Sequence, residues 1–184
     1  VKSLNDQHNL LQKIGFLINS ATMYMMTTGH ALLLDDYFTE LSQNTPGVVS
    51  ASLLGPDGES SFGDPFMENP ERLIKYVLQK GPAVIFSKGD LIYYGLPIAN
   101  SKRCHSCHRP DTEMRGALAS HFKPKGHPPA QILEAVLVTS LRHIMLSGLG
   151  RILKAFLNDV YASGLVTELK VYDNRGRVFH DVRT

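Results

Sequence analysis

The side chains with the clearest chemical capacity form one short motif, Cys104-His105-Ser106-Cys107-His108. Two cysteines separated by two residues can each form a thioether with a vinyl group of the same haem, and the histidine directly after them can bind the iron on one axial side. All three groups must reach one rigid macrocycle from a single turn of backbone, so the spacing makes the motif specific. The sequence therefore predicts a haem c attached through Cys104 and Cys107, with His108 as the proximal iron ligand.

Two other chemistries use a Cys-x-x-Cys pair, and both stay open at this point. A zinc site would take Cys104 and Cys107 with two further ligands, although the sequence has no second cysteine pair and its nearest histidine pair is His121 and His127. A thioredoxin-like dithiol would begin a helix after a strand, whereas a proline and an aspartate follow this motif and indicate a loop. Haem attachment accounts best for the whole pentapeptide.

The composition bears on the compartment of the protein. The motif contains both cysteines of the 184-residue chain, and haem c is attached after export, in an oxidising space outside the bacterial inner membrane. We therefore expect a periplasmic location. The chain starts with Val1, and we expect it to be the sensor portion of a longer, membrane-anchored protein. Its most apolar stretch, residues 132–149, is interrupted by charged side chains, and the net charge of +2 gives no reason to expect nucleic acid binding.

The rest of the chain predicts an α+β fold in which a sheet presents the haem loop. Apolar residues recur at spacings of three and four through residues 4–41, which predicts one long amphipathic helix, bent near Gly29. Turn residues then separate short β-type segments from a second helix. We expect strands at residues 48–54, 59–62, 83–87, 91–98 and 115–122, a helix at 71–79, the haem loop at 100–113 and a linker at 123–129.

Part of this pattern recurs near the end of the chain, as an internal repeat would. Met26 and Gly29 precede one helical stretch, and Met145 and Gly148 precede another. In both places a glycine ends the stretch, a strand follows, and a turn with Asp and Gly leads into another strand. The second copy has no haem motif and lacks the later strands. Its strands therefore either begin a tandem second domain or complete a sheet elsewhere, including one in a partner chain.

The order of a long helix, a hairpin, a helix, a hairpin and a last strand resembles PAS-like or Cache-like sensor domains, which lie outside the membrane in bacterial chemoreceptors and sensor histidine kinases. The run from Leu96 through the haem motif to Pro110, followed by Arg115-Gly116-Ala117-Leu118, is similar to the haem c variety of these domains. The resemblance implies a PAS-like antiparallel sheet with a long N-terminal helix and flanking C-terminal helices. The expected division is an N-terminal helical segment (1–46), a PAS-like haem c domain (47–122), and a helical segment with a terminal hairpin (123–184), which is a candidate for an incomplete second repeat.

The resemblance also implies a sixth iron ligand from the helix before the sheet, a position similar to that of Met26. Met23, Met26 and His30 share one helical face, while Met25 points about 100° away from Met26. We expect Met26 as the distal ligand and His30 as the alternative. Further candidate ligands are His121, His127, His143 and Met145; Lys102, Arg103, Arg109 and Arg115 are candidate partners of the haem propionates, and Tyr93 or Tyr94 is a candidate neighbour of the haem edge.

Three functional classes are compatible with these residues. In a sensor, redox state or a diatomic gas changes the axial coordination of the iron and moves the helix that carries the sixth ligand. The alternative is a periplasmic electron-transfer cytochrome, for which most of the chain would be unexplained. A haem enzyme would need an open iron site and an acid-base pair such as His30 with Arg142, and we expect no enzymatic activity. The apolar stripe of the long helix exceeds what one small sheet covers, which predicts a homodimer.

Overall fold

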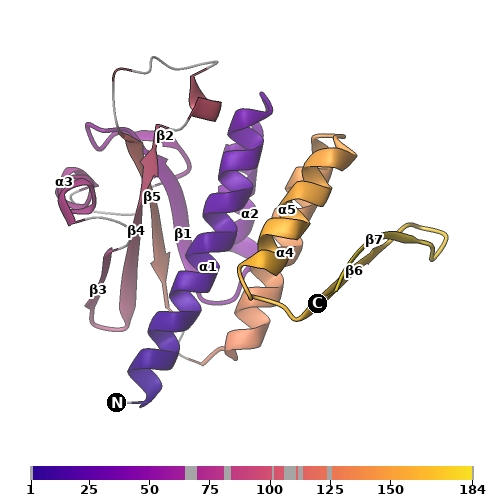
Figure 1. Ribbon diagram of the computed structural model, residues 1–184. Helices are drawn as coiled ribbons and strands as arrows, with labels where there is room; N and C mark the ends of the chain where they lie inside the picture. The colour runs from indigo at the N-terminus through magenta and orange to yellow at the C-terminus, as the bar shows by residue number, and fades with distance from the viewer. Residues whose placement is uncertain are drawn as a thin grey trace.

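The chain folds around one antiparallel sheet with helices on both of its faces, and the predicted α+β, PAS-like class is confirmed (Figure 1). The computed structural model describes residues 2–64, 70–80, 84–100, 102–105, 111, 114–123 and 126–183. Its elements are α1 (Lys2–Thr27), α2 (Leu33–Asn44), β1 (Val48–Leu54), β2 (Ser60–Phe62), α3 (Pro70–Lys80), β3 (Val84–Lys88), β4 (Leu91–Ala99), the short 3-10 helix η1 (Lys102–Cys104), β5 (Met114–Phe122), α4 (Pro129–Leu146), α5 (Gly150–Ala162), β6 (Glu168–Tyr172) and β7 (Val178–Arg183).

The main sheet has the strand order β2-β1-β5-β4-β3, so the last strand of the domain lies at its centre. β5 pairs with β1 on one side and with β4 on the other, and all neighbouring pairs are antiparallel. The five strands lie within one or two residues of the ranges that the sequence predicts, because each is a short β-type segment bounded by turn residues. The segment that joins β4 to β5 contains the haem motif.

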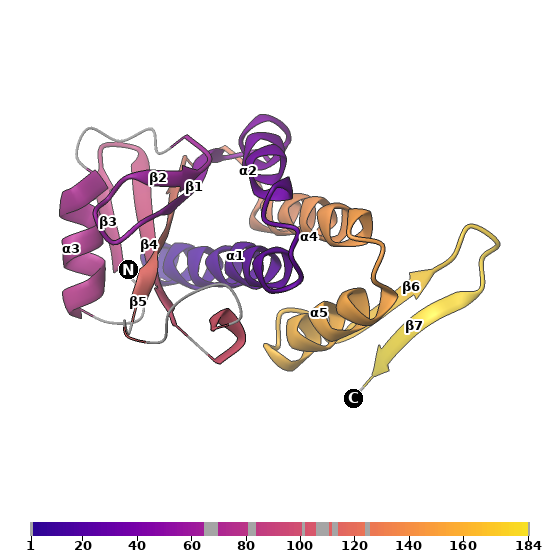
Figure 2. The same ribbon diagram turned by 90° about the horizontal axis from the view of Figure 1, so that it is seen from above.

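The two faces of the sheet are buried by different helices (Figure 2). On one face, α3 packs through Leu73, Ile74 and Val77 against small residues of β5. On the other face, a larger core joins the sheet to α1, α2, α4 and α5. The apolar stripe of α1 points into this larger core, as its spacing of three and four predicts: Leu10, Leu11, Ile14, Leu17, Ile18, Ala21 and Met25 are all buried.

The N-terminal helix is shorter than the sequence predicts. α1 ends at Thr27 and α2 follows after a short turn, so the prediction of one helix over residues 4–41 is wrong. Gly29 has a φ of 80°, and the amides of Gly29 and His30 donate to the carbonyls of Met26 and Met25 at 3.2 and 2.9 Å. This is a Schellman motif, which ends a helix at a left-handed residue that glycine adopts without strain. Gly29 therefore ends the helix instead of bending it.

The C-terminal part of the chain packs on α1 through α4 and α5. The hydroxyl of Tyr24 donates to a carboxylate oxygen of Asp159 at 2.7 Å, and the ring of Tyr24 meets the ring of Phe156 edge-on at 6.1 Å. Beyond α5, β6 and β7 form a separate two-stranded sheet. This hairpin rests on α5, where the ammonium of Lys154 lies 5.3 Å from the ring centroid of Phe179. One continuous set of contacts therefore joins the end of α1 to the terminal hairpin.

Candidate haem site

The structure describes the first two residues of the motif, Cys104 and the exposed His105. Cys104 is the last residue of η1, is 7% exposed, and lies with its Sγ 3.9 Å from the carbonyl oxygen of Ala99, to which the thiol donates. The predicted haem residues Cys107 and His108 lie outside the described residues. The site can therefore be built only from Cys104 and from the elements that surround its loop.

Local backbone geometry explains why a loop leaves the sheet at this point. The pairing of β4 with β5 shifts register between Ile98 and Ala99, and this bulge interrupts the regular ladder just before the loop. On the returning strand, Gly116 has a φ of 139°, and a Cβ there would collide with the carbonyl oxygen of Leu54. The strand can return at this depth only because residue 116 is a glycine. The bulge and Gly116 therefore lie at the ends of β4 and β5 that the motif-containing segment connects.

The end of α1 lies near η1, the described start of this loop. Figure 1 shows η1 level with the last turns of α1, at the end of the molecule where β4 also ends. α1 lies close to β4 at Gly15, where a Cβ would overlap the ring of Tyr94. Met26 follows Gly15 by eleven residues, and at about 100° per residue the two positions lie within about 20° of each other around the helix. Met26 therefore sits on the side of α1 that faces the sheet, near the level at which β4 ends.

The methionines around Met26 divide as the helical periodicity predicts. Met25 is 1% exposed in the larger core, which removes its thioether from the loop. Met23 and Met26 are half-buried and only partly packed against that core. A thioether that is not committed to the core can serve as a soft iron ligand, so Met26 remains the best placed of the three.

His30, the alternative ligand, contacts a neighbouring threonine through one ring nitrogen. Its Nδ1 lies 3.2 Å from Oγ1 of Thr28, and that hydroxyl donates to the carbonyl of Tyr24 at 2.7 Å. Because the single hydroxyl proton of Thr28 points to Tyr24, the oxygen accepts from Nδ1–H of His30. The lone pair of His30 is then on Nε2, and a hydrogen bond to the other ring nitrogen is the usual support of a metal-bound histidine. Cys104 thus offers a thiol for haem attachment, and Met26 and His30 each offer a donor atom that fits a haem iron.

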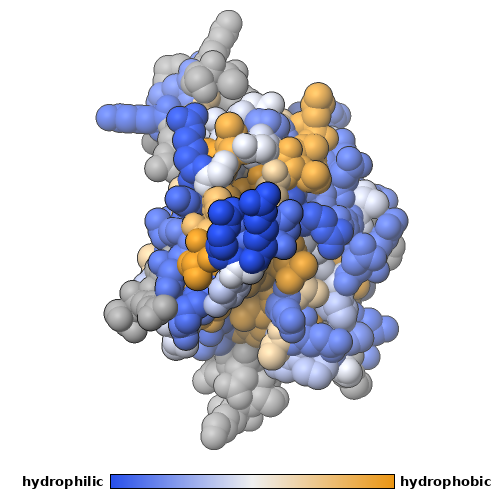
Figure 3. All heavy atoms as spheres, turned by 90° about the vertical axis from the view of Figure 1, so that its right-hand side faces the viewer, coloured by the Kyte–Doolittle hydropathy of each residue, from blue (hydrophilic) through white to orange (hydrophobic). Residues whose placement is uncertain are grey.

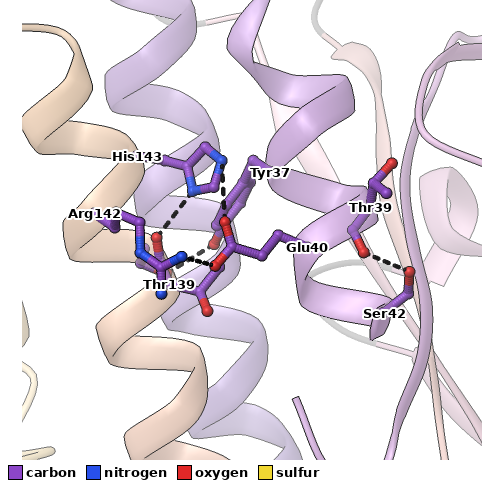
Figure 4. Close-up of polar contacts among 8 residues, drawn as sticks. Tyr37, Thr39, Glu40, Ser42, Thr139, Arg142 and His143 are labelled. Carbon is purple, nitrogen blue, oxygen red and sulfur yellow. Dashed lines mark hydrogen bonds and ion pairs between the residues drawn. The ribbon is translucent and has the colours of Figure 1, made fainter. Parts of the chain in front are cut away.

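Three other candidate ligands are placed by the structure: His143 is buried with partners of its own, and His127 and Met145 are exposed. His143 is buried between α2 and α4, where its Nδ1 donates to the carbonyl of Thr139 at 3.1 Å and its Nε2 faces Glu40 at 3.7 Å (Figure 4). The Glu40 carboxylate also pairs with Arg142 at 2.5 Å, so the guanidinium of Arg142 is paired with Glu40, whereas His30 contacts Thr28. His127 and Met145 are exposed, before α4 and near its end.

His121 belongs to a polar row on the α3 face of the sheet. Its ring is fully buried, its Nδ1 lies 2.5 Å from Oγ of Ser50, and Tyr93 packs edge-on at 4.6 Å between ring centroids. Burial lowers the pKa of His121 to about 4. It lies seven residues into β5 from Met114, or about 23 Å along the strand from the end of the loop. This separation weighs against a zinc site that joins Cys104 to His121.

The two tyrosines of β4 point to opposite faces, as strand geometry requires. Tyr93 lies beside His121, whereas Tyr94 is buried against Gly15 of α1, and burial raises the pKa of Tyr94 to about 12. Of the candidate propionate partners, Lys102 is exposed, and the side chains of Arg103, Arg109 and Arg115 lie outside the described residues.

A cleft of about 580 Å³ at the end of α1 is a feature that sequence reasoning missed. It separates the last turns of α1 from the first turns of α5, and its walls come from segments more than a hundred residues apart. No local pattern signals it, because it exists only once α5 packs on α1. Its lining residues are Tyr24, Thr27, Thr28, Leu149, Arg151, Ile152 and Ala155.

The chain matches no protein-family model, and no curated protein is similar to it in sequence. Within the described ranges, no three His, Cys, Asp or Glu side chains gather as a metal site, and Cys107 and His108 are not among the residues searched. In the same part of the chain, no helix is both long and apolar enough to cross a membrane.

Proposed function

We propose that this chain is the periplasmic haem c sensor domain of a membrane-anchored signal-transduction protein, of the kind found in chemoreceptors and sensor histidine kinases, and that it has no enzymatic activity. The observation that supports this proposal is the meeting of two features at one end of the fold. The short helix η1, which ends at the first cysteine of the motif, lies near the last turns of α1 in Figure 1, and Met26 sits on the side of α1 that faces the sheet.

The proposed binding residues are Cys104 and Cys107 for the thioethers, His108 on the proximal side, and Met26 on the distal side with His30 as its alternative. The haem supplies an iron whose preference between thioether, imidazole and a diatomic gas depends on its oxidation state. As a soft donor, Met26 would stabilise the reduced state of that iron. His30, whose Nδ1 lies 3.2 Å from Oγ1 of Thr28, would offer Nε2 as the alternative donor.

The helix that carries Met26 also carries the output contacts. One side of α1 faces the sheet, and another side carries Tyr24, whose hydroxyl and ring contact Asp159 and Phe156 of α5. Release of Met26 would let α1 shift, and the shift would reach α5 and the hairpin through Tyr24. A ligand change at the iron thereby becomes a displacement at the far side of the domain, where a homodimer would transmit it.

The experiment uses protein matured in a host that attaches haem c. We expect a six-coordinate low-spin spectrum in the reduced state, and we expect Met26→Ala to become high-spin and to bind carbon monoxide faster. Met23→Ala is the matched control because Met23 is also half-buried on α1, three residues away. An unchanged spectrum in Met26→Ala would remove Met26 as the ligand, and the same test on His30→Ala then decides the alternative.

A second readout separates a sensor from an electron carrier. Amide hydrogen exchange is compared between the oxidised and reduced states over α5 and the hairpin. A sensor predicts a change in exchange in these segments that Tyr24→Phe reduces. Identical exchange in both states would favour the carrier, because a carrier needs no change of structure between its two oxidation states.

A further inference from the structure

The terminal hairpin repeats the first hairpin of the main sheet at a constant offset of 118 residues. In both hairpins a strand is followed by a turn with the same two backbone hydrogen bonds, 2.8 Å across the turn and 3.0 Å within it. The turns join Gly55 to Glu59 and Asp173 to Arg177. The strand pairs also correspond, with a register shift at the same place: Leu53 with Phe62 and Leu54 with Ser60 in the first hairpin, Val171 with His180 and Tyr172 with Val178 in the second.

This correspondence indicates which strand of the second hairpin has an edge that can pair with a further strand. β7 corresponds to β2, which is the edge strand of the main sheet. β6 corresponds to residues 50–54 of β1, and all five of these residues pair on their other side with β5. Among the strands that the structure describes, none pairs with the equivalent edge of β6. An exposed strand edge of this kind is a template for another strand.

We propose that the outer edge of β6 pairs antiparallel with β6 of a second copy of this chain, which joins the two hairpins into one four-stranded sheet. The inference rests on the homodimer included in the proposed function and specifies its interface. A contact between identical strands about a two-fold axis is closed and uses the same residues on both sides. The hairpin projects from the helices in Figures 1 and 2, which leaves this edge accessible.

The charges of β6 select the register of the pairing. Glu168 and Lys170 lie on the face that points away from α5, while Leu169 is buried against the core. When the two-fold axis passes between the two Leu169 residues, Glu168 lies opposite the partner's Lys170, and Lys170 lies opposite the partner's Glu168. A shift of the axis to residue 168 or 170 sets like charges opposite each other, which is unfavourable. The complementary register also sets the two leucines against each other.

The face that carries the hairpin suits such a contact. Hydrophobic side chains lie beside the hydrophilic tip of the hairpin in Figure 3. Tyr172 and Val178 form a cross-strand pair in which each side chain is more than half exposed. A joined sheet brings two such pairs to one surface, where apolar cross-strand neighbours contribute to pairing.

The test measures dimerisation of haem-loaded protein by sedimentation equilibrium at low ionic strength. Wild-type protein is expected to dimerise. Glu168→Lys leaves two cations on each strand and Lys170→Glu leaves two anions, and each variant alone is expected to raise the dimer Kd roughly tenfold. An equimolar mixture of the two variants is expected to form heterodimers with nearly the wild-type Kd. Only contact between chains explains this recovery, because the Glu168–Lys170 pair within each chain remains broken.

Three outcomes would overturn the proposal. A dimer whose Kd is the same in both charge variants forms through another surface, which refutes this interface and leaves the proposed homodimer standing. Failure of the mixture to recover means that the single variants act within the chain. A protein that stays monomeric while the outer amides of β6 are protected from hydrogen exchange pairs this edge within its own chain. The same charge variants should leave the haem spectrum unchanged, so failure here is distinguishable from failure of the haem proposal.

Discussion

Acidification should destabilise this protein through His121, the buried histidine of β5. The folded protein holds the pKa of His121 at about 4, against 6.5 for an ordinary histidine, because burial disfavours the charged ring. Between pH 6.5 and pH 4 the unfolded chain therefore binds a proton at this position that the folded chain does not. Stability is fully present above pH 6.5 and is lost as the pH falls toward 4.

The size of the effect follows from the same two pKa values. Stability falls by up to about 1.4 kcal/mol per pH unit within this interval, so the full loss approaches roughly 3 kcal/mol. For a domain of this size, such a loss lowers the melting temperature by about 6 to 12 °C. The environment that causes it is the polar row of Ser50, His121 and Tyr93, whose imidazole is fully buried.

The assay is urea unfolding followed by circular dichroism at several pH values between 7.5 and 4.5. His121→Gln removes the titrating group, and the difference in unfolding free energy between wild type and variant should shrink as the pH falls. His127→Gln is the control, because His127 is exposed in the segment before α4. If the difference between wild type and His121→Gln were constant over this range, the assignment of the acid sensitivity to His121 would be refuted.

Two predictions concern packing and backbone geometry. Gly116→Ala should lower the free energy of unfolding by more than about 2 kcal/mol, because the φ of 139° and the adjacent carbonyl of Leu54 leave no place for a Cβ. Gly126→Ala, with open space around residue 126, should lower it by about 1 kcal/mol. Thermal unfolding compares the two variants, and equal losses would contradict this account. Phe156→Ala should lower the free energy of unfolding by about 3 to 5 kcal/mol, because the ring is fully buried. Leu32→Ala, at a side chain that is 88% exposed, should change it by less than about 0.5 kcal/mol. Urea titrations measure both variants, and a small loss for Phe156→Ala would refute the place of Phe156 in the core.

Local sequence signals predicted the sheet well because each strand is a short run between turn residues. Residues 48–54 begin with two β-branched valines and form β1, as the sequence predicts. The Pro56-Asp57-Gly58 turn closes the first hairpin in the structure, also as predicted. The prediction of a continuous helix over residues 4–41 was wrong, because the apolar residues keep a helical spacing on both sides of Gly29 although the helix ends there. The periodicity continues because α1 and α2 both bury an apolar face in the same core.

The candidate site could be predicted only where its chemistry is local in sequence. The spacing of Cys104, Cys107 and His108 is visible in five residues, whereas the facing of Met26 toward the sheet depends on the close approach of Gly15 to Tyr94, far apart in the chain. The low pKa of His121 likewise depends on strand register, which sequence alone does not give. The support of His30 by Thr28 is local, but it depends on the turn that ends α1.

The central claim is that a haem is bound covalently through Cys104 and Cys107. Intact-mass spectrometry of protein matured in a host that attaches haem c tests it most directly. The account predicts a mass equal to that of the polypeptide plus one haem, a Soret band that stays with the denatured chain, and loss of both in the Cys104→Ala, Cys107→Ala double variant. A wild-type mass equal to that of the bare polypeptide, with no Soret absorbance, would contradict it.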